Sequence, residues 1–386
     1  MYEKLVILHT ANYSRKIRDF FCVDTLIKKG LDVEFWNCGK ITVEEHLSPV
    51  FSEDLLMVDI ESIADFNNQI SKHMDKKCLY LSYISYAYYS YELYRTLSYN
   101  NVDILYAVSG CMPIQNVETN RRNILNRIKS GSIRNFVRNR YYNYRLSSSQ
   151  FVPLKYVMES CDVAQADYKV SDETMHIACN SSDYECFRKA SPWTSDNNKP
   201  YSVFIDQYIP YHNDLKLLGK DLISPSDYYN SLNHYFDEYE QHNSCDVIIA
   251  AHPSAVEYKN GNPYNGRQIV YNKTAELVKG AISVLAHCST AISFAVLDYK
   301  PIILLTSDFI ENYFKYLSIH IHSFNEMIGC DLQNVDHPSA FVGQQVNRTL
   351  YDSYRYKLLT TRQAENISNA DVIESIVKGT YMSYVR

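Results

Sequence analysis

The sequence predicts an α/β protein of two domains, in each of which helices cover both faces of a parallel β-sheet. The first observation is length, because 386 residues exceed one ordinary core and favour two domains. The second is composition: 46% hydrophobic and 21% charged residues are typical of a folded globular chain. The third is the alternation of strand-like apolar runs with helical spacings in both halves, which indicates parallel sheets.

Short apolar runs and helically spaced apolar residues alternate along the first half. Gly30 is a plausible C-terminal stop for the first helical stretch. We expect strands at 4–9, 31–36, 78–84 and 102–108, and helices at 15–29 and 86–98.

The second half repeats this pattern more clearly. A long helix should open at Ser224 as N-cap, with Pro225 at the first helical position and Asp227 three residues after the cap. We expect strands at 201–206, 246–251, 282–286 and 301–305, and helices at 224–241, 273–280, 290–299 and over much of 348–385. The polar stretch 193–199 divides an N-terminal domain, 1–195, from a C-terminal domain, 196–345, and helices in 346–386 should pack back toward the first domain.

Several classes of function are excluded by composition. The net charge of −6 argues against a nucleic-acid binder, and 11 glycines leave little room for glycine-rich nucleotide fingerprints. The ten cysteines include no C-x-x-C pair, so we expect reduced thiols, no metal knuckle and no bound cofactor. The chain has no Asp-x-Asp pair, no apolar run of transmembrane length and too short an N-terminal apolar run for a signal peptide, so we expect a cytoplasmic protein without a metal site.

Polar residues follow four consecutive strands of the second half, and the carboxyl edge of a parallel sheet is where ligands bind. Ser289 and Thr290 stand before a helix, where hydroxyls and free N–H groups form an anion site or simply cap the helix. A lone histidine after a strand is also often structural, so that alternative stays open for His252. The residues at these strand ends are Asp206 and His212, His252 with Pro253, His287 with Ser289 and Thr290, and Thr306-Ser307-Asp308.

The pair of motifs His252-Pro253 and Ser289-Thr290 resembles the His-Pro and Ser-Ser/Thr motifs of bacterial sialyltransferases, polysialyltransferases and capsule transferases that use CMP-activated ulosonic acids. The resemblance covers about 201–308 and implies the GT-B fold: α/β, with two Rossmann-like domains facing a cleft. It implies that His252, Ser289 and Thr290 hold the phosphate of a nucleotide-sugar donor without a metal, and that Pro253 and His287 belong to the same nucleotide-sugar-binding site.

Two further parts of the donor and acceptor site follow from this resemblance. Thr274 and Glu276 lie where GT-B enzymes approach the donor's base and ribose, although Thr274 could instead cap a helix. The acidic motif that supplies the general base in those families is missing, because no glycine here follows Asp or Glu. His9, Asp206 and His212 are the alternatives for the base, and the loop with His9, Asn12 and Ser14 is the candidate acceptor loop.

The segment 121–155 is strongly basic in a chain of net negative charge. It contains no Asp or Glu, and aromatic and apolar residues lie between its cations. This pattern favours an anionic partner, either an anionic membrane surface with a lipid-linked acceptor or a polyanionic glycan, and the alternative is a solvated helix pair between domains. The candidate patch is Arg121, Arg122, Arg127, Arg134, Arg138 and Arg140.

Together these features predict a glycosyltransferase of bacterial surface polysaccharide or glycolipid biosynthesis. The predicted donor is a CMP-activated ulosonic acid, such as sialic acid or a Kdo-like sugar, and the predicted acceptor is a glycan or a lipid-linked glycan. Three alternatives remain: a GT-B transferase with a UDP- or GDP-sugar, CDP-polyol phosphate or phosphoenolpyruvate donor, a nucleotide-sugar epimerase, and a non-catalytic glycan-binding module.

Overall fold

The computed structural model describes residues 1–10, 15–42, 55–108, 137, 140–142, 144–145, 151–161, 169–195, 199–211, 223–339 and 345–385. These residues form two compact units. The first unit contains the described residues up to Ser182 and the segment from Thr360 onward, and the second unit runs from Asp183 to Leu359. Each unit is built on its own parallel sheet.

Within the described residues, seven parallel strands form the sheet of the first unit in the order β3-β2-β1-β4-β5-β6-β7. Strands β2 and β3 are added in turn on one side of β1, and strands β4 to β7 are added in turn on its other side. The strand order therefore reverses between β1 and β4. The strands are β1 (Lys4–His9), β2 (Asp32–Asn37), β3 (Leu56–Asp59), β4 (Cys78–Ser82), β5 (Asp103–Val108), β6 (Tyr156–Glu159) and β7 (Met175–Ala178).

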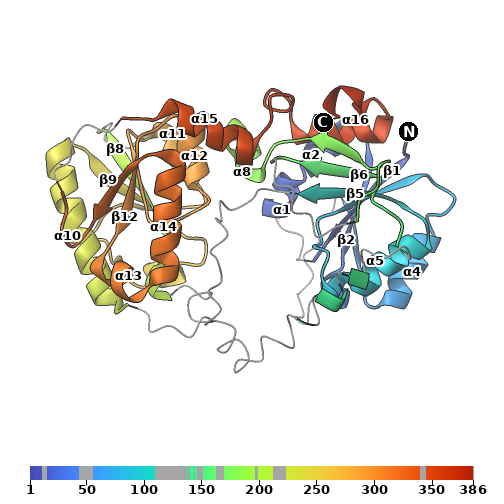
Figure 1. Ribbon diagram of the computed structural model, residues 1–386, viewed down its shortest axis with the longest axis horizontal. Coiled ribbons are helices and arrows are strands. Elements are labelled where there is room, and N and C mark those ends of the chain that lie inside the picture. Colours follow the sequence, from blue (N-terminus) through green and yellow to red (C-terminus); the bar gives the residue numbers. More distant parts are fainter. Residues whose placement is uncertain are drawn as a thin grey trace. The chain divides into compact units, whose positions relative to one another are not determined.

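The middle of strand β1, residues 5–8, is entirely apolar because both faces of this sheet are covered. Leu5 and Ile7 belong to one core cluster with α2 (Val23–Lys28) and α16 (Asn369–Lys378), which lie side by side (Figure 1). Val6 and Leu8 point to the opposite face and pack with α4 and α5. The remaining helical elements of this unit are α1 (Arg15–Phe20), α3 (Gly39–Thr42), α4 (Ile63–Ser71), η1 (Tyr88–Ser90), α5 (Tyr91–Tyr99) and η5 (Tyr381–Tyr384).

Six parallel strands form the second sheet in the described part of the chain, in the order β10-β9-β8-β11-β12-β13. This order has the same reversal as the first sheet, here between β8 and β11. The strands are β8 (Tyr201–Ile205), β9 (Asp246–Ala251), β10 (Ile269–Tyr271), β11 (Val284–Ala286), β12 (Ile302–Thr306) and β13 (Asp331–Asn334).

The longest helix, α10 (Pro225–Asn243), begins where the sequence predicts. Pro225 is its first residue, and the helix ends at Ser244 in a left-handed conformation with φ of 51°. Its inward face buries Leu232 and Phe236 in the core of the second unit. The other helices of this unit are α8 (Ser182–Lys189), η2 (Ile209–Tyr211), η3 (Val256–Lys259), α11 (Thr274–Gly280), α12 (Ile292–Leu297), α13 (Asp308–Tyr313), α14 (Lys315–Ile328), α15 (Arg348–Tyr354) and the π-helix η4 (Arg355–Leu359).

The observed division of the chain differs from the predicted domain limits. The second unit begins at Asp183 rather than at 196, because the segment after α8 is bonded to α11: Trp193 N donates to Glu276 O over 2.9 Å, and Lys279 Nζ donates to Ala190 O over 2.7 Å. The chain rejoins the first unit at Thr360 rather than at 346, because α15 packs against α12 and α14.

Candidate active site

Four neighbouring strands of the second sheet carry the predicted polar residues at one edge. Because β8, β9, β11 and β12 are parallel, with Ile205 beside Ala250 and Ala286, their carboxyl ends meet at that edge. Asp206 follows β8 and His252 follows β9. The edge includes the point between β8 and β11 where the strand order reverses, which is the usual ligand position in such sheets.

Two consecutive side chains at the end of β8 reach in opposite directions. Asp206 reaches the loop after β9, where its Oδ2 lies 3.5 Å from His252 N. Gln207 reaches the loop after β11, where its Oε1 accepts from Cys288 N over 2.7 Å. Consecutive side chains of an extended chain point to opposite sides. The two contacts therefore join the loops after β8, β9 and β11 around the switch point.

Asp206 is buried, with 3% of its surface exposed. Its Oδ1 accepts from Tyr208 N over 2.8 Å, and its Oδ2 accepts from Tyr258 OH over 2.7 Å. Burial raises the pKa of the carboxyl to about 6, although hydrogen bonds from Tyr258 and Tyr264 and from the His252 backbone oppose that rise. A general base must contact the acceptor hydroxyl, so the structure does not support Asp206 in that role.

His252 is half-buried at the mouth of this edge, and Pro253 beside it is exposed. Its ring stacks on the ring of Tyr208, with centroids 6.4 Å apart and planes 7° from parallel. Ser254 N donates to Nδ1 over 3.2 Å, so the neutral imidazole carries its hydrogen on Nε2. His252 therefore has the tautomer that donates from Nε2.

The loop after β11 places Ser289 half-buried and Thr290 exposed. The Ser289 hydroxyl accepts from Ala291 N over 3.2 Å. The helix α12 begins at Ile292 and has six residues, so it starts later than the predicted 290 and Thr290 lies in the turn before it. Both hydroxyls therefore belong to a loop at the sheet edge, close in sequence to the Gln207 contact at Cys288.

His287 was predicted as a donor-binding residue, and the structure places it in the core instead. It is 0% exposed. Nδ1 donates to Leu305 O over 2.7 Å, and Nε2 accepts from Tyr228 OH over 3.1 Å. Burial lowers its pKa to about 4. Since both ring nitrogens are satisfied inside the protein, His287 is a structural histidine.

Two other predicted regions lie farther along the same edge. Thr274 and Glu276 are half-buried at the start of α11, after the edge strand β10, and the N-cap residue is Lys273 rather than Thr274. Asp308 follows the cap residue Ser307 of α13 and is bonded to Asn334 and His337, which lowers its pKa.

The first sheet has its own switch point, and aromatic rings occupy it. His9 ends β1 and stacks on Tyr83 with centroids 5.8 Å apart and an angle of 11°. It also lies 6.2 Å from the Phe35 ring and 6.0 Å from the Phe21 ring. This edge is therefore rich in flat apolar faces. The predicted residues His212, Asn12 and Ser14 lie outside the described residues.

Most of the basic segment also lies outside the described residues, including Arg121, Arg122, Arg127, Arg134 and Arg138. Three of its cations are described. Arg140 is exposed. Arg145 Nη2 donates to Tyr91 OH over 3.1 Å, and Lys155 Nζ pairs with Asp103 over 2.7 Å. Two of the three therefore have partners within the first unit.

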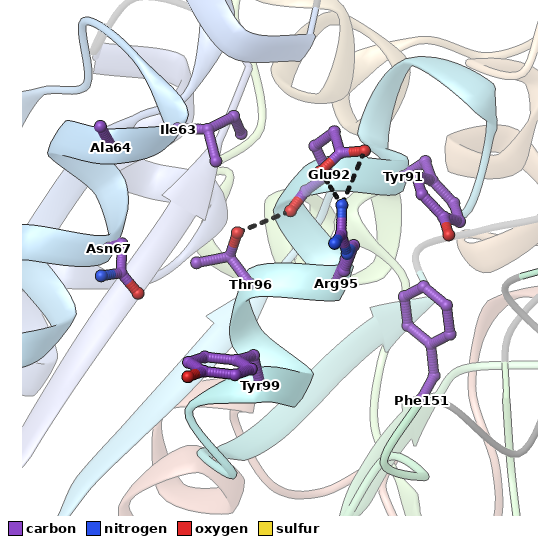
Figure 2. A pocket seen from close by; sticks show the side chains of 9 residues that line it. All are labelled: Ile63, Ala64, Asn67, Tyr91, Glu92, Arg95, Thr96, Tyr99 and Phe151. Atoms are coloured by element: carbon purple, nitrogen blue, oxygen red, sulfur yellow. Dashed lines mark hydrogen bonds and ion pairs between the residues drawn. The ribbon is translucent and has the colours of Figure 1, made fainter.

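A shallow pocket of about 530 Å³ opens on the first unit between α4 and α5 (Figure 2). Its polar groups are engaged with one another: Arg95 pairs with Glu92 over 3.1 Å, and Thr96 donates to Glu92 O over 2.8 Å. None of the predicted site residues lines this pocket. Its lining is Ile63, Ala64, Asn67, Tyr91, Glu92, Arg95, Thr96, Tyr99 and Phe151.

The described residues contain no group of three or more His, Cys, Asp or Glu side chains placed to hold a metal ion. None of the helices that they form combines the length and apolar character needed to cross a bilayer.

The sequence matches no protein-family model and no curated protein. Its structure is similar to that of a putative UDP-N-acetylglucosamine 2-epimerase from Listeria monocytogenes, with 9% identity, a TM-score of 0.50, and 99% of this chain and 97% of that chain covered. It is also similar to the wall teichoic acid polymerase TagF, with 10% identity, a TM-score of 0.50, and 98% of this chain and 88% of that chain covered. The fold is GT-B, with two Rossmann-like parallel-sheet domains. At 9–10% identity, the similarity to these two structures supports a shared fold but no shared activity or substrate.

The residues around Asp206 were only partly recognised from the sequence. Tyr208 and Gln207 stand beside it in the chain, so their position after a strand was a usable signal. Tyr258 is brought to Asp206 by the fold of the loop after β9, and no spacing or motif in the sequence indicates that contact.

Proposed function

We propose that this chain is a glycosyltransferase that moves a sugar from a nucleotide-activated donor to a glycan acceptor in surface polysaccharide or glycolipid biosynthesis. The observation that carries the proposal is the position of His252 at the carboxyl edge, next to the switch point and with Nε2 as donor. A polar edge of this kind on a GT-B scaffold suits the phosphate of a nucleotide sugar.

The proposed reaction is a direct displacement at the anomeric carbon. The acceptor oxygen forms the new bond as the bond to the donor phosphate breaks, and the electron pair leaves with the phosphate. His252 Nε2–H and the hydroxyls of Ser289 and Thr290 would stabilise that charge by donating hydrogen bonds. A base takes the acceptor proton, and of the three predicted candidates His9 is the one that the structure leaves open among the described residues.

The finer proposal is a CMP-activated ulosonic acid as donor. Its support is the resemblance of His252-Pro253 and Ser289-Thr290 to the motifs of sialyltransferases and capsule transferases. Other donors give different outcomes of the same test: CDP-polyol phosphate, a UDP- or GDP-sugar, or phosphoenolpyruvate. The putative UDP-N-acetylglucosamine 2-epimerase among the similar structures makes UDP-linked compounds the first comparison.

The acceptor is proposed to be a glycan or a lipid-linked glycan. The basic segment that includes the exposed Arg140 supports contact with an anionic membrane surface. We place the protein in the cytoplasm, in peripheral contact with the inner face of the plasma membrane.

The test begins with thermal-shift measurements against CMP, CDP, UDP and GDP, followed by transfer assays with the activated sugars of the stabilising nucleotide. His252→Ala should lower transfer by about 10²–10³-fold while leaving the melting temperature near that of the parent, since one phosphate donor is lost. His234→Ala, which changes an exposed histidine of α10, is the control. Near-parental transfer by a folded His252→Ala variant refutes the assignment. Epimerised donor formed without acceptor would identify an epimerase, and no response to any nucleotide would favour a binding module.

A further inference from the structure

The loops that follow β8 and β9 are joined through one buried carboxylate. Asp206 accepts from Tyr208 N in its own loop and from Tyr258 OH in the loop after β9, over 2.8 Å and 2.7 Å. It also lies 3.5 Å from His252 N. Tyr258 is 7% exposed and belongs to η3, a few residues beyond His252. Asp206 therefore contacts both ends of the short segment 252–258.

Tyr208 completes this arrangement from the other side of His252. Its φ is 55°, in the left-handed region that costs free energy for a residue with a side chain. Its ring lies parallel to the His252 ring, and its hydroxyl is buried without a hydrogen-bond partner among the described residues. The hydrogen bond from its own N–H to Asp206 stabilises that backbone conformation. The position of the His252 ring thus depends on contacts that begin at Asp206.

Two further hydroxyls lie within hydrogen-bond distance of Tyr258 OH. Tyr229 OH from α10 lies 3.0 Å from Tyr258 OH, and Tyr264 OH lies 3.3 Å from it. Because a phenol both donates and accepts, Tyr258 can donate to Asp206 while accepting from one of these neighbours. The whole group is buried, so a lost bond inside it is not replaced by water.

We propose that Asp206 and Tyr258 are positioning residues that fix His252 for donor binding by joining the loops after β8 and β9. The proposal rests on the proposed function for the role of His252, and on the contacts above for the link itself. Neither residue contacts the donor, and their effect reaches it through the placement of Nε2.

The link should depend on pH, because backbone and phenol donors converge on an ionised carboxylate and protonation removes one acceptor position. The pKa of Asp206 is raised to about 6 by burial, so this change falls in an accessible range. Among the described residues, His252 is the group interacting with Asp206 that can become positively charged. The other titratable groups that interact with it are phenols: Tyr258 and Tyr264, Tyr228 and Tyr229 of α10, and Tyr271 of β10.

The variants that test the link are Tyr258→Phe, which removes its donor, and Asp206→Asn, which removes the carboxylate at nearly constant shape. The matched control is Tyr239→Phe. Tyr239 is also buried, and its hydroxyl bonds Ser202 and Ser283 over 3.0 Å and 2.7 Å at the opposite end of β8. All three variants lose a buried polar contact in the same domain, so general loss of stability affects the control equally.

The first measurement is hydrogen exchange of the ligand-free full chain. Peptides covering 252–259 should exchange about tenfold faster in Tyr258→Phe and Asp206→Asn than in the parent, and at the parental rate in Tyr239→Phe. The second is CMP affinity between about pH 5 and pH 8. Affinity of the parent should fall toward acid through about pH 6, while Asp206→Asn should bind about tenfold more weakly at pH 8 and lack that fall.

The two proposals fail in different ways. If Tyr258→Phe and Asp206→Asn match Tyr239→Phe in both exchange and CMP affinity, the positioning role is refuted. If exchange responds as expected but the parent neither binds CMP nor transfers sugar, the link between the loops is upheld and the proposed function with its CMP donor is refuted. A parental pH dependence that persists in Asp206→Asn would belong to His252 or to the phosphate of CMP, whose second pKa is also about 6, and would refute the role of Asp206 in it.

Discussion

Replacing Asp206 by Asn should change how folding stability depends on pH. Asp206 is 3% exposed, and burial raises its pKa from 3.8 to about 6. One pKa unit between the folded and unfolded states corresponds to about 1.4 kcal/mol, so this carboxyl contributes a pH-dependent difference of about 3 kcal/mol.

The sign follows from proton uptake. Between pH 6 and pH 3.8 the folded chain holds a proton on Asp206 that the unfolded chain does not, so the folded state is favoured as the pH falls through this range. The parent should therefore gain up to about 3 kcal/mol from this group between neutral pH and about pH 4, whereas Asp206→Asn gains nothing from it. At pH 7 the variant loses hydrogen bonds to the carboxylate but no longer buries a charge.

The assay is urea unfolding of parent and variant at several pH values between about 7.5 and 4, followed by circular dichroism. Other groups that titrate are common to both proteins and cancel in the difference between their free energies of unfolding. Asp75→Asn, which changes an exposed carboxylate, is the control. If the curves for Asp206→Asn and parent stay parallel over this range, Asp206 does not titrate as its burial requires and the reasoning is wrong.

Three further predictions concern charge at the site and at the surface. Transfer should survive excess EDTA, because His252 and two hydroxyls are proposed to meet the phosphate charge; loss in EDTA with recovery in magnesium or manganese would contradict this. The His287 imidazole should stay neutral down to about pH 4 in NMR titration, because burial lowers its pKa, and a midpoint near 6.5 would show that it is solvated. Replacing Arg134, Arg138 and Arg140 by Ser should weaken binding to anionic vesicles by about 1 kcal/mol per residue near the surface, and the parent should lose binding in salt. Equal binding to neutral vesicles would leave the basic segment without a membrane role.

The central strands were predictable and the edge strands were not. The stretches 5–8 and 247–251 are entirely apolar because helices cover both faces of the sheet there, and such runs stand out in a sequence. The predicted set lacks β3, β7, β10 and β13, which are the four edge strands of the two sheets, together with the short strand β6. Each has only three or four residues, and an edge strand pairs on one side only, so its sequence need not be uniformly apolar.

Two of the predicted histidines, His252 and His287, differ in role because different residues pack against their rings. His252 and His287 both follow strands at the same edge, and the sequence gives no reason to treat them differently. His287 is structural because its Nε2 accepts a hydrogen bond from the hydroxyl of Tyr228 on α10, which lies 59 residues away in the sequence. The ring of His252 faces Tyr208 in the loop after β8 instead. Contacts between distant segments of this kind depend on how the helix packs, which local patterns do not encode.

The two sheets share a strand order but differ in what stands at the point where that order reverses. In the second sheet the loops there carry Asp206, Gln207 and the Ser289 hydroxyl, and hydrogen bonds to Asp206 and Gln207 join the loops. In the first sheet the equivalent point is occupied by His9, stacked on Tyr83. Hydroxyl and N–H groups that donate hydrogen bonds suit a phosphate, whereas flat aromatic faces suit the C–H faces of a sugar. Within the proposed function, the second unit is therefore the one to bind the nucleotide and the first unit the one to receive the acceptor, and His252→Ala and His9→Ala should weaken binding of different substrates.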